Sequence, residues 1–177
     1  SSFFWAPLDL SAQDLCPENI VTVFPKDAIP AILSPSFEGG SEVFWLNGKD
    51  EVVGVEVNGD SRAYPVSILS RVEIVNDKVG GIPIAVTWSP LGYTALVYDS
   101  RIAGKELTFG VSGKLHFNSL IMYDHQTDGL WSHLIGSAIT GPLEGKKLRP
   151  LENLFTRWET WRKLYPGSKV LTIGRSS

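Results

Sequence analysis

The feature that most constrains the fold is the regular alternation of short apolar runs and turn-forming residues over positions 42–140, without sustained helical periodicity. The clearest example begins at residues 53–57, where valines alternate with glycine and glutamate. Asn58-Gly59 then supplies the two left-handed residues of a type I′ turn, and alternation resumes over residues 64–68. This pattern predicts a β-hairpin whose second strand extends to Ile68.

Similar turn sequences recur at residues 76–81, 99–104 and 126–129, each between β-branched or aromatic runs. Connections this short favour strands that pair in sequence order. The sequence therefore predicts a mainly β fold, an antiparallel meander closed into a barrel or a sandwich, since closure removes exposed sheet edges. The two forms of closure stay open at this point.

Signals for a helix are concentrated near the C-terminus. Residues 156–159 fit a capping box and Pro166-Gly167 fits a stop, so one short helix is expected between them. Trp158, Trp161 and Tyr165 have helical spacing and predict an aromatic face against the β core.

The N-terminal part reads differently. Pro25, Pro30 and Pro35 each fix their own φ angle and push the preceding residue toward extended backbone, so residues 21–40 are expected to form an irregular strap. No repeat, low-complexity tract or linker divides the sequence, and a single domain over residues 1–177 is expected.

Charge and cysteine content exclude several classes. The 16 basic and 19 acidic residues are scattered and give a net charge of -3, so no basic stripe exists for nucleic acid. No apolar run reaches the roughly 18 to 20 residues of a transmembrane segment, and the chain as given is expected to be soluble. Cys16 is the only cysteine, which excludes an internal disulfide and a cysteine-rich metal site.

Several motifs carry a family resemblance. They are Arg62-Ala-Tyr-Pro65, Glu73-Ile-Val-Asn-Asp77, Thr87-Trp-Ser-Pro-Leu91, Phe109-Gly-Val-Ser-Gly113, Met122-Tyr-Asp124, Leu130-Trp-Ser132 and Gly141-Pro142. In order and spacing they resemble the family called domain of unknown function 3179, over roughly residues 25–170. The resemblance implies an exported protein (periplasmic, cell-surface or secreted), but it implies no particular reaction.

The sequence departs from the family pattern at three positions. Family members carry His-Glu before the Ile-Val-Asn-Asp run and Cys-Pro-Leu-Cys after the next strand, whereas Val72, Ser89 and Gly92 stand at those positions here. One imidazole and two thiols suit a soft metal ion or a redox pair, and valine and glycine side chains suit neither. The resemblance thus implies a retained scaffold with its metal or redox chemistry lost, and no cofactor.

Strand alternation places a pocket near these substitutions. If Val72 points inward, Glu73 points outward, and position 72 faces the strand that carries Ser89 and Gly92. Such a pocket suits a small apolar or mixed ligand. Arg62 could instead anchor an anionic ligand, or pair with Asp77 or Asp124 if buried. The candidate ligand-binding residues are Val72, Ser89, Gly92, Arg62, Tyr64, Trp88, Tyr93, Asn118 and Trp131.

Two other functions stay open. A thiol-independent enzyme (hydrolase, isomerase or cyclase) could use Ser89, Lys114, Glu73 or Asp124, although the nucleophile-elbow pattern is absent. An interaction module could present some of the six tryptophans to a protein or glycan. An enzyme should bring a group with a perturbed pKa to the pocket, and an interaction module should expose a tryptophan patch.

The three histidines do not predict a metal site. With a turn at residues 126–129, His125 lies opposite Leu130 and His133 opposite Met122, so the two imidazoles face opposite sides of the sheet. His116 has no spacing that ties it to either of them. The expectation is therefore that no metal is bound.

Overall fold

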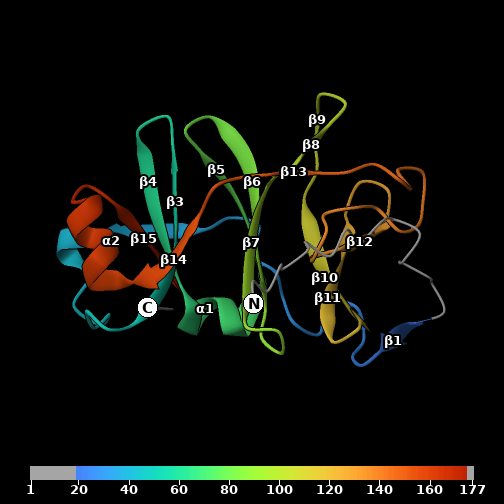
Figure 1. The fold of residues 1–177 in the computed structure, drawn as a ribbon, viewed down its shortest axis with the longest axis horizontal. Helices are drawn as coiled ribbons and strands as arrows, with labels where there is room; N and C mark the ends of the chain where they lie inside the picture. Colours follow the sequence, from blue (N-terminus) through green and yellow to red (C-terminus); the bar gives the residue numbers. More distant parts are fainter. Residues whose placement is uncertain (1–18, 175–177) are drawn as a thin grey trace, which may run out of the picture.

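The structure is a computed structural model that describes residues 19–174, in which three β-sheets stack side by side along the longest axis of the molecule (Figure 1). Cys16 lies outside the described residues. No helix in the described part is both long and apolar enough to cross a membrane.

Each sheet is named here by its central long strand. The β3 sheet has the order β14 (Leu154–Arg157), β3 (Glu51–Val57), β4 (Asp60–Pro65), β15 (Lys169–Thr172) and β2 (Ser36–Gly39). The β6 sheet has the order β13 (Arg149–Pro150), β7 (Thr94–Asp99), β6 (Ile82–Ser89) and β5 (Ile74–Val79). The β10 sheet has the order β1 (Ile20–Thr22), β10 (Phe109–His116), β11 (Ser119–Asp124) and β12 (Leu130–Ser132). A small ribbon pairs β8 (Arg101–Ile102) with β9 (Lys105–Glu106), and the helices are the 3-10 turn η3 (Gly40–Glu42), α1 (Val66–Val72) and α2 (Trp158–Leu164).

The mainly β prediction is confirmed. Of the two forms of closure that the sequence left open, the barrel is wrong, because the strands of residues 19–174 form several separate sheets. Sequence-order pairing holds for β5-β6-β7 and for β10-β11-β12. It fails in the β3 sheet, where β15 returns from the end of the chain to pair in parallel with β4. The sheets bury their apolar faces by packing against one another, and not by closing into a barrel.

The buried apolar residues of the described part form three cores. One core joins the β3 and β6 sheets and contains Val55 and Val86, and a second joins the β6 and β10 sheets and contains Ile74 and Met122. The third lies under helix α2. The β6 sheet is therefore covered on both faces, which explains why β6 reads as a continuous apolar run without alternation.

The predicted hairpin and C-terminal helix are confirmed, each with a difference at its end. Val57 pairs with Asp60 across the Asn58-Gly59 turn. Trp158 and Trp161 of α2 pack on the β3 sheet as expected. The predicted capping box does not form, because Thr156 belongs to strand β14 and backbone carbonyls cap the helix instead.

Residues 66–72 form helix α1 and do not continue the second strand of the hairpin, so that part of the prediction is wrong. Val66, Leu69 and Val72 recur every third residue and are all buried, which is a helical pattern. The helix closes one end of the core between the β3 and β6 sheets. Because the helix ends at Val72 and β5 begins at Ile74, Glu73 itself lies outside a strand and strand alternation does not orient its side chain.

The proline-containing strap is less irregular than predicted, because it contributes strands to two sheets. Residues 20–22 pair with β10, Ile32 bridges to Val75, and residues 36–39 pair with β15. The strap thereby connects the β10 sheet with the β3 sheet across one side of the stack.

Candidate functional site

A pocket of about 320 Å³ opens where the ends of β5 and β6 meet the β10 sheet under the strap. Its walls are mostly carbon, from Ile29, Val111, Leu115 and Leu120. The polar or charged lining residues are Glu73, Ser89 and Lys114. Three of the four residues predicted as catalytic candidates thus line one pocket, and Asp124 does not.

The backbone of Glu73 turns its side chain toward this pocket. Glu73 follows the last residue of α1 with φ 60° and ψ −32°, a left-handed value that is unusual for a residue other than glycine. Its N–H donates to the Leu69 carbonyl at 2.7 Å, and its carbonyl accepts from Trp88 N–H at 2.7 Å. The sequence prediction that Glu73 faces outward from a strand is wrong, because residue 73 is a helix cap.

The Glu73 carboxyl group is half-buried and has no partner among residues 19–174. Burial raises its pKa from 4.5 to about 7. Within residues 19–174, no group donates a hydrogen bond to this carboxylate and no cation pairs with it. A carboxylate in this state can accept a proton near neutral pH, or it can form an ion pair with a positively charged group of a ligand.

Two of the three substituted positions lie together. Ser89 is buried, and its Oγ accepts a hydrogen bond from Leu120 N–H at 3.4 Å. A Cβ atom placed on Gly92 would lie 3.9 Å from that oxygen. Val72 is buried in the core between the β3 and β6 sheets and does not line the pocket. Because residues 66–72 form a helix, Glu73 lines the pocket and Val72 lies in the core, the reverse of the prediction.

The predicted aromatic lining residues lie elsewhere. Trp88 is buried in the core between the β3 and β6 sheets, and Tyr93 covers it from outside at a ring-centroid distance of 4.9 Å. Trp131 is buried between the β6 and β10 sheets. Asn118 is exposed in the β10–β11 turn with φ 60°. None of these residues lines the pocket.

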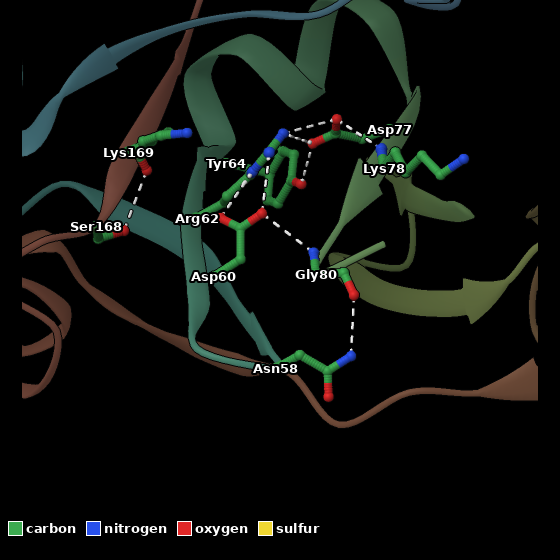
Figure 2. Close-up of polar contacts among 9 residues, drawn as sticks. All are labelled: Asn58, Asp60, Arg62, Tyr64, Asp77, Lys78, Gly80, Ser168 and Lys169. Carbon is green, nitrogen blue, oxygen red and sulfur yellow. Dashed lines mark hydrogen bonds and ion pairs between the residues drawn. The ribbon is translucent and has the colours of Figure 1, made fainter. Parts of the chain in front are cut away.

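Arg62 and Tyr64 do not line the pocket and belong to a polar network between β4 and β5 (Figure 2). Arg62 donates to both carboxylate oxygens of Asp77 at 2.8 and 3.0 Å, and Tyr64 donates to Asp77 at 2.6 Å. Asp60 accepts from the same guanidinium group. Of the two carboxylate partners that the sequence left open, Asp77 is the one observed, and the group joins β4 to β5.

Asp124 also has a structural role. Its carboxylate accepts from the backbone N–H of Thr127 at 2.6 Å and from the indole N–H of Trp131 at 2.8 Å. These contacts fix the β11–β12 turn.

Asn76 was not predicted and joins two sheets. It accepts from Phe109 N–H at 2.8 Å and donates to the Phe109 carbonyl at 2.9 Å. Its position in the Glu73–Asp77 motif was visible in the sequence, but its partner lies in another sheet. Of the motif carboxylates at positions 73, 77 and 124, only that of Glu73 is directed into the pocket.

The strap residues of the pocket also escaped prediction. Val23 and Phe24 form part of the rim, and their N–H groups donate to the Gly113 carbonyl at 2.8 and 3.1 Å. Gly113 has φ +78°, and a Cβ atom there would lie 2.0 Å from the Phe24 carbonyl oxygen. A glycine that ends a strand motif was the available signal, but the sequence does not say what approaches it.

The histidines are dispersed. The predicted register is wrong by two residues, because Leu130 pairs with Tyr123, and His133 N–H donates to the Leu120 carbonyl. His133 is buried, which lowers its pKa to about 4, and its Nδ1 lies 2.7 Å from Thr87 Oγ1. No group of three potential metal ligands occurs within residues 19–174.

The fold and the pocket define a class of mainly antiparallel β domain, with three stacked sheets and an apolar pocket that contains one carboxyl group without a partner in the described part of the chain. The model of the family described as "protein of unknown function (DUF3179)" matches residues 26–177, and the chain belongs to this family. Searches of curated proteins and of solved structures found no match.

Proposed function

We propose that this domain binds a small, largely apolar molecule in the Glu73 pocket, as part of an exported protein. The pocket itself carries the proposal, since its volume of about 320 Å³ and mostly carbon walls fit a small ligand. Export rests on the family resemblance alone. The metal or redox chemistry implied for relatives is not part of this function, because Val72, Ser89 and Gly92 supply neither imidazole nor thiol.

Binding of a neutral fluorescent dye tests the proposal. N-phenyl-1-naphthylamine should give a saturable rise in fluorescence with one site per chain. Leu115→Trp would fill the pocket and should weaken dye binding by about tenfold or more. Leu154→Trp is the matched control on the distant β3 sheet and should bind dye normally. Unchanged binding in Leu115→Trp would contradict the proposal.

A second candidate function is proton transfer by a thiol-independent enzyme, as in an isomerase. The observation in its favour is the Glu73 pKa of about 7, which suits a general acid or base at neutral pH. Its weakness is the lack of a partner group. Lys114 Nζ donates to Thr22 Oγ1 of the strap, and the Ser89 hydroxyl has no carboxylate or imidazole within hydrogen-bond distance among the described residues. Ligand binding therefore ranks first.

The interaction-module alternative receives less support. It required several exposed tryptophans, but of the five within residues 19–174 only Trp45 is exposed, at 40%. The others are buried in the cores. An aromatic surface for a protein or glycan would therefore depend on other residues.

A further inference from the structure

We propose that the Glu73 pocket selects molecules that combine an apolar body with a protonated amine, which pairs with the Glu73 carboxylate. This inference rests on the proposed ligand-binding function of the same pocket and adds the chemical class of the ligand.

Other buried carboxylates in the described part of the chain are paired. Asp77 receives an arginine and a tyrosine, Asp99 receives two arginines, and Asp124 receives an indole and a backbone amide. Glu73 receives no donor from residues 19–174, although burial has removed part of its hydration. A buried charge without a partner is costly, and a cationic ligand would supply the missing partner.

The charges that face Glu73 in the pocket favour a cationic ligand. Of the residues that line the pocket, Glu73 and Lys114 are the two with titratable side chains. The Lys114 ammonium group donates to Thr22 Oγ1 at 2.8 Å on the exposed side of β10. Burial raises the pKa of Glu73, and within residues 19–174 no cation compensates its charge. An anionic ligand would be repelled, and a neutral ligand would leave the carboxylate unpaired.

The volume of the pocket limits the size of the ligand. A volume of about 320 Å³ equals that of about ten water molecules, at the roughly 30 Å³ that one water molecule occupies in the liquid, and so suits a small organic molecule. The carbon walls from Ile29, Val111, Leu115 and Leu120 suit an aryl or alkyl group. An arylalkylamine such as phenethylamine therefore matches the pocket in volume, polarity and charge.

Calorimetric titration with three matched probes tests this inference. Phenethylamine, 2-phenylethanol and 3-phenylpropionate have nearly the same shape and differ in charge. At about pH 8 the amine should bind about tenfold more tightly than the alcohol, and the carboxylate should bind most weakly. Between about pH 8 and pH 6 amine binding should weaken by about fivefold, as Glu73 with its pKa of about 7 takes up a proton and then binds the amine no better than the alcohol, whereas alcohol binding should not weaken.

Variants assign the effect to one residue. Glu73→Gln should reduce amine binding to the level of the alcohol and keep binding of both the alcohol and N-phenyl-1-naphthylamine. Glu144→Gln removes an exposed carboxylate outside the pocket and should leave the amine preference unchanged. If the amine binds no better than the alcohol while the dye still binds, the amine inference is overturned and the proposed function stands. If neither the dye nor any probe binds, both are overturned.

Discussion

Glu73 combines two energetic costs that a purely structural residue rarely carries together. Its left-handed backbone conformation costs on the order of 1 kcal/mol in a residue other than glycine. Its carboxyl group has a pKa raised by burial to about 7. A raised carboxyl pKa means that the folded state holds the proton more tightly than the unfolded chain, so stability falls as pH rises from about 4.5 to about 7.

The first residue-scale prediction follows from this linkage. Glu73→Gln removes the charge and should raise the free energy of unfolding at about pH 8 by on the order of 1 to 2 kcal/mol, allowing for the part of the side chain that water reaches. At about pH 3 the wild-type carboxyl is protonated in both the folded and the unfolded state, so the difference should vanish there. Urea unfolding at the two pH values measures it. A variant less stable than wild type at about pH 8 would contradict the account.

The contacts of a single side chain could be predicted only where its partner lies near in sequence or on the same sheet. The pairing of Arg62 with Asp77 was one of two alternatives drawn from charge alone, and the structure selects it. The direction of Glu73 was predicted wrongly because it rested on strand alternation. The bridge from Asn76 to Phe109 joins two sheets, and no local pattern indicates such a contact.

At the scale of elements, helix α1 and the strap decide where the pocket lies. Residues 64–68 alternate as a strand would, but Val66, Leu69 and Val72 also fit a helical face, and a short apolar run leaves the choice to tertiary packing. The same alternation correctly predicted the β3–β4 hairpin, because its turn residues fix both ends. The missed helix accounts for the exchanged roles of Val72 and Glu73.

The element-scale prediction concerns the contact between the strap and β10. Gly113→Ala would press a methyl group against the Phe24 carbonyl, so the strap should shift, dye binding should weaken and stability should fall by about 1 to 3 kcal/mol. Gly59→Ala is the matched control, since it has φ +81° with nothing within 4 Å of its added Cβ. Hydrogen exchange at the Val23 and Phe24 amides should accelerate only in Gly113→Ala. Equal exchange in both variants would show that Gly113 does not hold the strap.

At the scale of the whole molecule, the β6 sheet is the layer on which the other two sheets pack. The sequence contained one sign of this, the continuous apolar run of β6, which a sheet covered on both faces requires. The stacking order could not be read from it, because β15 pairs with β4 and β14 pairs with β3 across long separations in sequence. The pocket lies at the junction of the β6 and β10 sheets, so its walls come from segments that local patterns treat separately.

The most direct test of the central claim is the titration of the Glu73 carboxyl carbon by NMR, with and without saturating phenethylamine. In the free protein the midpoint should lie at about 7. A bound cation favours the ionised carboxylate, so the amine should lower this midpoint by about one unit or more. A midpoint near the ordinary 4.5 in the free protein, or one that the amine leaves unchanged, would contradict the assignment of Glu73 as the ligand's charge partner.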